Sequence, residues 1–342
     1  MDTGPAGHRI PTLEEVARTA GVSRATVSRA INGGDRVSAR AREAIDRAIA
    51  ELGYIPNRAA RSLVTRRTDS VALVVPETGN RFVADPVLTG ALQGITTALA
   101  GTDLQLVLLV AQQVGDTAGQ LRYLRAGHVD GALVISHHRE DQLPAELAKT
   151  RLPFVFGGRP LDPGNVDVPY VDADNVGSGR TAAAHLLRRG HQMIATVAGP
   201  RDMPAGVDRL AGWRKELSAA GRRVDLVEYG DFTPEGGAAA MSRLLAHHPD
   251  LDAVFVASDL MATGALRVIH ESGRRVPQDI AVVGHDDSVL ARTAMPPLTT
   301  VRQPAEEMGR RMAELLIEQL GGSPQRSVAE ILPTELVVRA SA

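Results

Sequence analysis

The chain has 342 residues, of which 44% are hydrophobic and 23% charged, with a formal net charge of −2 and no cysteine. These values exclude a disulfide framework and a thiolate metal site, and they indicate more than one domain with a large apolar core. The first residues lack the apolar segment of a secretion signal, and the longest apolar run, near 104–111, is far too short to span a membrane. We therefore expect a cytoplasmic protein with no membrane partner.

Charge is unevenly distributed along the chain. Residues 1–67 contain 12 arginines, no lysine and seven acidic residues, which gives this segment a net charge of +5 and leaves −7 for the remainder. A basic segment attracts phosphate groups and is typical of a nucleic-acid-binding module. A solvated basic tail is the plain alternative, but a tail lacks the apolar periodicity described next.

The pattern of residues 12–32 predicts two short helices joined by a tight turn. Thr12 and Glu15 have the spacing of a capping box, Gly21 stands where the first helix must end, and Ser23 can cap the second helix. A small apolar core is supplied by Val16, Ala17, Ala20, Val22, Val27 and Ile31. This is the helix-turn-helix pattern, which places its second helix in the major groove of DNA.

A third amphipathic helix is predicted over 37–52, where it completes a three-helix core. The segment from Tyr54 to Leu63 follows it. Asn57 can cap one or two helical turns there, and a helix of that length is marginal by itself.

From Val71 onward, short apolar strands alternate with helices. Strands are predicted at 71–75, 104–110, 132–135, 154–156, 193–197, 253–256 and 280–283, and helices at roughly 86–100, 116–126, 175–189, 206–220, 234–247, 259–272 and 304–320. This alternation predicts parallel sheets covered by helices on both faces, and two sheets fit the pattern better than one. In such folds ligands bind beyond the carboxyl ends of the strands.

These motifs, in this order, resemble the LacI/GalR family of bacterial transcription regulators. The match is gapless from Thr12 to Leu63 and continues through DGALVIS, YVDADN, VAGP, ASDLMATGAL, VPQDIAVVGHDD and PPLTTVRQP. The resemblance implies an α/β protein with a helix-turn-helix headpiece at 10–56, a hinge helix and linker at 57–67, and a core at 68–342 that resembles periplasmic sugar-binding proteins. It implies two Rossmann-like subdomains, at 68–171 with 302–332 and at 172–301 with 333–342, linked by crossovers near 170–173, 300–303 and 331–334.

The resemblance also assigns DNA contacts to the headpiece and hinge. Arg24, Ala25 and Arg29 match base-reading positions of the second helix, and Leu63 matches an apolar wedge in the minor groove. An ordinary linker helix with a buried leucine is the alternative for Leu63. The complete set of candidate DNA-binding residues is Thr12, Ser23, Arg24, Ala25, Thr26, Ser28, Arg29, Asn32, Tyr54, Asn57, Arg58 and Leu63.

A small saccharide effector bound between the subdomains is the second implication of the resemblance. Arg209 matches an arginine that holds the effector, Asp286 a carboxylate that accepts sugar hydroxyls, and Phe232 an aromatic that stacks on the sugar. A surface helix arginine and a core phenylalanine are the alternatives for Arg209 and Phe232, and Asp259 is either near the pocket or only a helix cap. Further candidates at strand ends are Phe82, Asp85, Ser136, His137, Arg159 and Ser258.

Catalytic, metal and cofactor motifs are not indicated. The GxGxxA stretch at 177–182 lies inside a predicted helix instead of a strand-to-helix turn, so it is a poor dinucleotide signal. Neighbouring residues do not share a helix or strand face, which argues against chelation by the pairs at 137–138 and 247–248 and by Asp286 with Asp287. We expect no enzyme activity, metal or cofactor.

The sequence thus predicts a homodimeric repressor of carbohydrate-utilisation genes that binds a palindromic operator and is released by a sugar. One headpiece reads one half-site, and no heptad helix follows the last predicted strand, which favours a dimer. Stretches such as RRTDSVALVV, FGGRP and GDFTPEGG resemble the actinobacterial branch that responds to cellobiose and cello-oligosaccharides, although Val83 and Val87–Leu88 stand where aromatics are common. A corepressor, a non-sugar ligand, or an enzyme or transport protein with an added headpiece are the alternatives.

Overall fold

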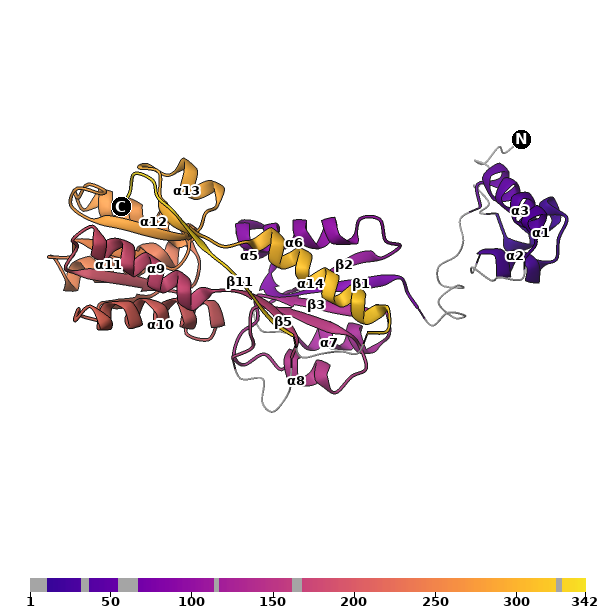
Figure 1. The fold of residues 1–342 in the computed structure, drawn as a ribbon, viewed down its shortest axis with the longest axis horizontal. Coiled ribbons are helices and arrows are strands. Elements are labelled where there is room, and N and C mark those ends of the chain that lie inside the picture. Colours follow the sequence, from indigo (N-terminus) through magenta and orange to yellow (C-terminus); the bar gives the residue numbers. More distant parts are fainter. Residues whose placement is uncertain (1–10, 32–36, 55–66, 114–116, 162–167, 324–327) are drawn as a thin grey trace, which may run out of the picture. The chain divides into compact units, whose positions relative to one another are not determined.

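The structure is a computed structural model of the full chain, and it describes all residues except 1–10, 32–36, 55–66, 114–116, 162–167 and 324–327. It consists of two compact units, Met1–Thr68 and Asp69–Ala342 (Figure 1). None of the helices in the described ranges has both the length and the hydropathy needed to cross a membrane.

The first unit contains α1 (Leu13–Ala20), α2 (Arg24–Ile31) and α3 (Ala39–Leu52). The predicted capping box is present, because Glu15 N donates to Thr12 Oγ1 at 3.3 Å and Thr12 N donates to Glu15 Oε2 at 2.7 Å. Thr26 N donates to Ser23 Oγ at 3.2 Å, as expected of a cap on α2. Helix α3 begins two residues later than predicted, since Ser38 caps it by accepting from Ala41 N.

The second unit contains two six-stranded sheets, which define two lobes. The N-lobe sheet has the order β11-β5-β4-β3-β1-β2, and the C-lobe sheet has the order β12-β10-β9-β8-β6-β7. All strand pairs are parallel except β10 with β12. The predicted α/β class with two parallel sheets is therefore confirmed.

The N-lobe elements are β1 (Ser70–Thr78), α5 (Gly79–Ala84), α6 (Pro86–Leu99), β2 (Gln105–Ala111), α7 (Ala118–Arg125), β3 (Gly131–Ile135), α8 (Leu143–Ala148), β4 (Phe154–Gly157), β5 (Tyr170–Ala173), α14 (Ala305–Leu320) and β11 (Ala329–Leu332). The C-lobe elements are α9 (Asn175–Arg188), β6 (Ile194–Ala198), α10 (Pro204–Ala219), β7 (Val227–Tyr229), α11 (Pro234–His247), β8 (Ala253–Val256), α12 (Asp259–Glu271), β9 (Ala281–Asp286), α13 (Val289–Thr293), β10 (Thr299–Arg302) and β12 (Glu335–Val337). Apolar clusters cover both faces of each sheet, as parallel sheets require.

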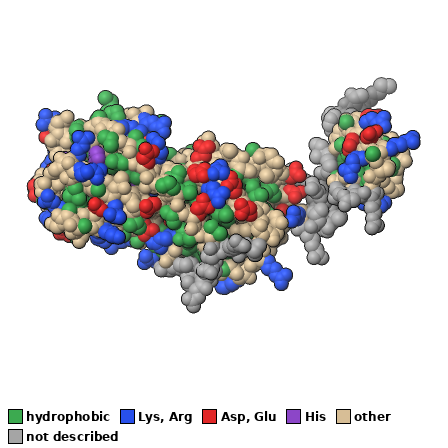
Figure 2. Space-filling view, in the orientation of Figure 1, with side chains coloured by type: hydrophobic (Ala, Val, Ile, Leu, Met, Phe, Trp, Pro, Cys, Tyr) green, Lys and Arg blue, Asp and Glu red, His purple; other side chains and the backbone are tan. Residues whose placement is uncertain are grey.

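The chain passes between the lobes three times: after β5, after β10 and between β11 and β12 (Figure 1). The segments predicted as crossovers at 170–173 and 300–303 are themselves mostly strands, and the chain changes lobe just after them. On the face shown in Figure 2, acidic and basic side chains alternate over α14, where Arg310 pairs with Glu307 and Glu314.

The GxGxxA stretch at 177–182 has a packing role. A Cβ on Gly179 would lie 2.0 Å from the carbonyl oxygen of Arg209, and a Cβ on Gly212 would lie 2.0 Å from that of Val176. These two glycines therefore allow α9 and α10 to pack backbone to backbone. The close packing fixes where Arg209 emerges on α10.

Candidate functional site

A cavity of about 120 Å³ lies between the lobes, and it is lined by residues of both. Its walls include seven of the nine predicted effector-binding residues: Asp85, Ser136, His137, Arg209, Phe232, Ser258 and Asp286. The cavity sits beyond the carboxyl ends of several strands, where the two-sheet architecture predicts a ligand site.

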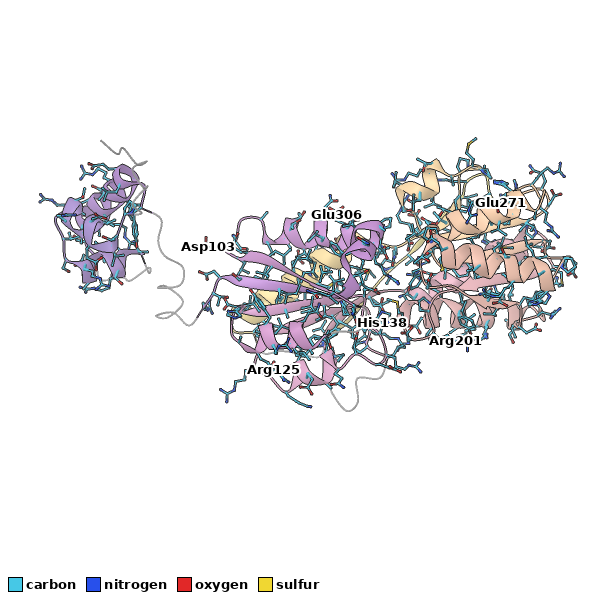
Figure 3. All side chains as sticks on the ribbon, turned by 180° about the vertical axis from the view of Figure 1, so that it is seen from behind. Asp103, Arg125, His138, Arg201, Glu271 and Glu306 are labelled. Atoms are coloured by element: carbon cyan, nitrogen blue, oxygen red, sulfur yellow. The ribbon has the colours of Figure 1, made fainter. Side chains whose placement is uncertain are left out.

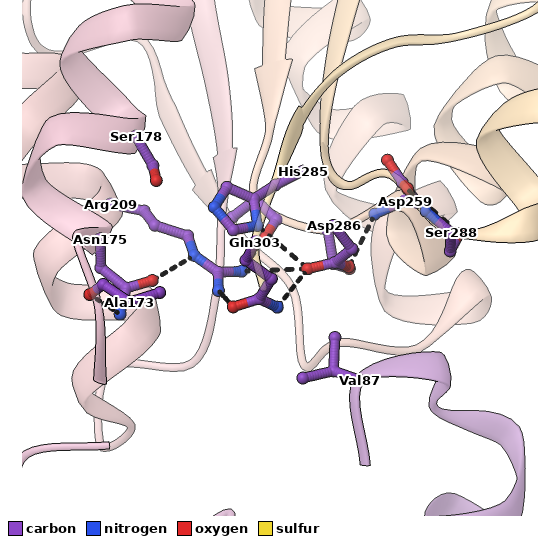
Figure 4. A network of polar contacts seen from close by, with 12 residues as sticks. Val87, Ala173, Asn175, Ser178, Arg209, Asp259, His285, Asp286, Ser288 and Gln303 are labelled. Carbon is purple, nitrogen blue, oxygen red and sulfur yellow. Dashed lines mark hydrogen bonds and ion pairs between the residues drawn. The ribbon is translucent and has the colours of Figure 1, made fainter. Parts of the chain in front are cut away.

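Arg209 is the centre of the polar wall on the C-lobe side. Arg209 is almost fully buried, with 4% of its surface exposed. Its Nε donates to Asn175 Oδ1 at 2.8 Å, its Nη1 to the carbonyl oxygen of Ala257 at 2.6 Å, and its Nη2 to Gln303 Oε1 at 3.3 Å (Figure 4). Asp286 Oδ1 lies 3.9 Å from Nη1 and accepts from Gln303 Nε2 at 2.7 Å. The guanidinium is therefore held in place by several groups of the protein itself.

Carboxylates surround this arginine. Burial raises the pKa of Asp85 and the pKa of Asp172 to about 6, and both side chains line the cavity. Burial also raises the pKa values of Asp286 and Asp259, which repel each other across the end of the C-lobe sheet. Such groups gain from new hydrogen-bond donors, because a donated hydrogen stabilises the charged form of a buried acid.

The N-lobe side of the cavity also has an apolar part. Val87 of α6 faces the polar network in Figure 4. The other apolar side chains on the N-lobe side are Leu88, Ala91, Ile135, Ala305, Met308 and Met312. The N-lobe side of the site therefore combines these aliphatic side chains with polar ones, which are Arg81, Asp85, Ser136, His137 and Asp172.

Backbone conformation marks the same place. Among the described residues, five non-glycine residues have positive φ, and three of them line the cavity: Ser136 (φ 57°), Phe232 (φ 62°) and Asp286 (φ 120°). Positive φ is unfavourable for side chains with a Cβ, and such strain concentrates at functional sites. It is an indication of function that is independent of side-chain chemistry.

Phe232 lies at the boundary between the cavity and the apolar core. It belongs to the C-lobe apolar cluster and also lines the cavity. The guanidinium carbons of Arg209 and Arg81 lie 5.9 and 6.0 Å from its ring centroid. His137, also on the wall, donates from Nε2 to the carbonyl oxygen of Arg159 at 3.0 Å, and burial lowers its pKa to about 4. Its ring is therefore neutral at pH 7.

Two of the predicted effector residues do not line the cavity. Phe82 turns into the N-lobe apolar cluster, and its neighbour Arg81 lines the cavity instead, because successive helical residues point about 100° apart. Arg159 uses its guanidinium to bind Asp208 of the C-lobe through two hydrogen bonds of 2.8 and 2.6 Å. The expectation that these two side chains line the cavity is therefore wrong, because it was based on strand ends alone, while their contact with an effector stays a prediction.

The alternative role of Asp259 as a helix cap is also wrong. Ser258 caps α12 by accepting from Met261 N at 3.1 Å, while the carboxylate of Asp259 accepts from Thr300 Oγ1 at 2.7 Å and Ser288 N at 2.8 Å. The neighbouring Asp287 binds Arg302 and Arg339, so the two adjacent aspartates at 286–287 do point to different partners. No cluster able to hold a metal ion occurs among the residues that the structure describes.

In the headpiece, the predicted base-reading side chains lie on the outer face of α2. Arg24, Ala25 and Arg29 are exposed, and Arg24 Nε lies 2.9 Å from Glu14 Oε1. Thr12 and Ser23 are exposed caps, and Thr26 and Ser28 are partly buried. Tyr54 packs into the three-helix core with 8% exposure. Asn32, Asn57, Arg58 and Leu63 lie outside the described residues.

The sequence did not single out four polar residues of the cavity: Arg81, Asp172, Asn175 and Gln303. Asp172 and Gln303 stand at or just after strand ends, so recognising β5 and β10 as strands would have indicated them. Asn175 precedes Arg209 by 34 residues, and only the folded structure brings the two side chains together.

A helix-turn-helix unit followed by a two-lobed α/β core with a buried polar cavity defines the class of ligand-binding transcription regulators. The model of the bacterial regulatory proteins of the lacI family matches residues 12–57, and the periplasmic binding protein-like domain matches 183–342. The chain is 53% identical to the transcriptional regulator CelR of Thermobifida fusca, over 97% of this chain and 98% of that protein. It is 32% identical to the repressor CytR of Escherichia coli K12, over 96% of each.

Solved structures agree with these relatives. A complex of the regulator CelR with cellobiose superposes with a TM-score of 0.78 at 51% identity, covering 97% of this chain and 100% of that one. The lac repressor dimer bound to operator and an anti-inducer gives a TM-score of 0.85 at 31% identity, covering 97% and 99%. The chain belongs to the lacI family of bacterial regulatory proteins. The prediction of a DNA-binding regulator, not an enzyme, is thereby confirmed.

Proposed function

We propose that this chain is a repressor of carbohydrate-utilisation genes that binds a palindromic operator as a homodimer and is released by cellobiose or a short cello-oligosaccharide. The observation that carries the proposal is the buried polar wall around Arg209, with Asn175 and Gln303 beside it and the carboxylates Asp172 and Asp286 at its ends. Such a wall offers donors and acceptors in alternation, which suits the neighbouring hydroxyls of a neutral sugar.

Charge and shape restrict the ligand further. The carboxylates of the cavity disfavour an anionic ligand, while the aliphatic side chains on the N-lobe side suit the apolar face of a sugar ring. Small-molecule sites usually measure about 300–1,000 Å³. The cavity measures about 120 Å³, and we propose that the lobes move apart to admit a disaccharide and then close on it. The CelR–cellobiose complex, to which this chain is similar, supports a β-linked glucose disaccharide as the first ligand to test.

The DNA-binding part of the proposal rests on the headpiece. We propose that residues 10–56 read one half-site through Arg24, Ala25 and Arg29, and that 57–67 form the hinge in which Asn57, Arg58 and Leu63 meet the minor groove. The core at 68–342 then binds the effector and pairs with a second copy, as in the lac repressor dimer. We place its action in the cytoplasm, on the chromosome.

Operator binding measured with and without sugars tests this function. A palindromic duplex selected from random-sequence DNA is titrated with the protein, and fluorescence anisotropy reports the affinity alone and with cellobiose, cellotriose or the α-linked control maltose. Cellobiose should weaken operator binding, and the operator should weaken cellobiose binding by the same factor. Tighter operator binding with sugar would identify a corepressor, and no response to any sugar would identify a different ligand; either result contradicts the proposal.

A further inference from the structure

A second polar cluster joins the two lobes outside the cavity. His138 follows β3 in the N-lobe, and both of its ring nitrogens have carboxylate partners. Its Nε2 lies 3.1 Å from Glu77 Oε1, and its Nδ1 lies 2.7 Å from Asp202 Oδ2. Glu77 is on β1 of the N-lobe, whereas Asp202 precedes α10 of the C-lobe. Figure 3 shows His138 at the junction of the lobes.

Glu77 anchors this cluster. It is fully buried, accepts from Ser136 Oγ at 3.0 Å, and its Oε2 lies 3.4 Å from Arg81 Nε. The peptide group next to His138 adds to the contact, since Arg139 N donates to the carbonyl oxygen of Asp202 at 2.7 Å. Arg81 also reaches the C-lobe by donating to the carbonyl oxygen of Asp231 at 2.9 Å. A buried carboxylate of one lobe is thus connected to the other lobe through His138 and Arg81.

The proton on His138 decides whether the bridge is complete. Carboxylates only accept hydrogen bonds, so both ring nitrogens must donate, and only the imidazolium can do so. The titratable groups around the ring are Glu77, Asp202, Asp141 and His137, and Arg81 pairs with the Oε2 of Glu77. Asp141 accepts from the backbone N of His138 at 2.7 Å. The hydrogen bond to Glu77, followed by the one to Asp202, raises the pKa of His138 to about 9 against the opposing effect of burial.

The cluster reaches the cavity only through its neighbours. Ser136 and Arg81 line the cavity, whereas Glu77, His138 and Asp202 do not. His138 is therefore placed to act on the ligand through the position of the lobes and not by touching it.

Resting on the proposed function, we propose that His138 is a positioning residue whose imidazolium joins Glu77 of the N-lobe to Asp202 of the C-lobe and holds the cleft closed around the effector. When the lobes part, His138 loses Asp202 but keeps Glu77. The pKa of His138 is then lower in the open state than in the closed state, so the closed state binds the proton on His138 more tightly. The contribution of His138 to effector affinity should be full below its open-state pKa and should be lost as pH rises through about 9.

A built-in control spans the same two lobes. Arg159 binds Asp208 across the cleft, and burial does not remove its charge because the carboxylate raises the pKa of this arginine. Asp208→Asn should therefore weaken effector binding without changing its pH dependence, whereas His138→Gln should do both. His128, an exposed histidine next to Tyr123 on the N-lobe, supplies the second control as His128→Gln.

The first experiment is calorimetric titration with cellobiose between pH 7 and 10. Wild type and His128→Gln should lose affinity on the alkaline side. His138→Gln should bind about tenfold more weakly at pH 7, the loss expected for one hydrogen bond between charged groups, and its affinity should be flat across the range. Wild-type affinity and a wild-type pH profile in His138→Gln would overturn the proposal.

A second experiment measures the lobes directly and needs no ligand. The chain has no cysteine, so spin labels can be attached at Asp103→Cys on the N-lobe and Glu271→Cys on the C-lobe, both labelled in Figure 3. Samples diluted with unlabelled protein report distances within one chain. The distance should lengthen or broaden in His138→Gln at pH 7. If cellobiose does not bind the wild type, the proposed function fails, but this distance still decides the role of His138, and an unchanged distribution contradicts it.

Discussion

The headpiece and the cleft use arginine in opposite ways. The side chain of Arg24 on the headpiece is 71% exposed and touches one carboxylate, whereas that of Arg209 is 5% exposed and is bound on every side. An exposed guanidinium is free to follow the phosphates and base edges of DNA, and its binding is sensitive to salt. A buried guanidinium is fixed before the ligand arrives, so it favours ligands whose acceptor groups match its geometry. One chain thus combines an adaptable DNA-binding surface with a preorganised ligand site.

The largest expected effect is the loss of sugar binding in Arg209→Ala. The substitution removes the donor at the centre of the polar wall and leaves Asp286 without its nearest cation. We expect a loss of about 3 kcal/mol or more, which exceeds 100-fold in affinity. Calorimetry with cellobiose measures it, and Arg214→Ala, an exposed residue on the same helix, is the matched control. Operator binding in the absence of sugar should survive in both variants, and a normal sugar response in Arg209→Ala would refute the assignment.

Arg29→Ala in α2 should produce the next largest effect, and it should be confined to DNA. If Arg29 contacts a base pair, the variant should lose about 1–3 kcal/mol of operator affinity and much less affinity for scrambled DNA. Anisotropy titrations on both duplexes at one salt concentration measure the difference. Arg47→Ala on α3, whose Nε donates to the carbonyl oxygen of Glu43, controls for the loss of a positive charge from the headpiece. Equal losses on both duplexes would show that Arg29 contacts only phosphate.

The same contrast explains how far the sequence could predict the molecule. The interactions that form the headpiece are local in sequence, because its caps, turn and apolar core lie within 12–54. Spacing alone therefore predicted that Thr12 and Ser23 are helix caps and that Gly21 ends α1. Elements with a clear apolar signal were also predicted closely, such as the 14-residue helix α11 and the short, fully buried strand β8. Short edge strands such as β7 were missed because three half-buried residues give no apolar run.

The cleft was predicted only in part because its residues are distant in sequence. Motifs indicated Arg209 and Asp286, but Gln303, which connects them, is 94 residues from Arg209. After β1 the sequence indicated the segment that lines the cavity, but the rotation of α5 turns Phe82 inward and Arg81 toward the cavity. Which side chain a helix presents depends on packing that sequence spacing alone does not determine.

The acids of the cleft should make sugar binding pH-dependent. Asp85 and Asp172 have pKa values of about 6 because they are buried, and sugar hydroxyls donate to their charged forms. A bound sugar therefore lowers these pKa values, so affinity is full well above pH 6 and declines as the pH falls below it. Each acid can contribute up to about tenfold by pH 5. Calorimetry from pH 7.5 to 5 measures the decline, and Asp85→Asn, which can still cap α6, should reduce it; an equal decline in this variant would exclude Asp85 as its source.

The smallest effect concerns the stability of the headpiece. Glu15 accepts from the backbone N of Thr12 at 2.7 Å, so Glu15→Ala leaves an amide at the start of α1 without its partner. We expect a loss of about 0.5–1 kcal/mol in the free energy of unfolding of this unit. Glu15→Gln keeps an acceptor at the same position and should retain most of it. Because the headpiece and the core are separate compact units, chemical denaturation should show the change in the headpiece transition alone, with cellobiose binding unaltered. A matching loss in the core transition would show that the two units unfold together. The headpiece would then not be an independent DNA-binding unit beside the preorganised cleft.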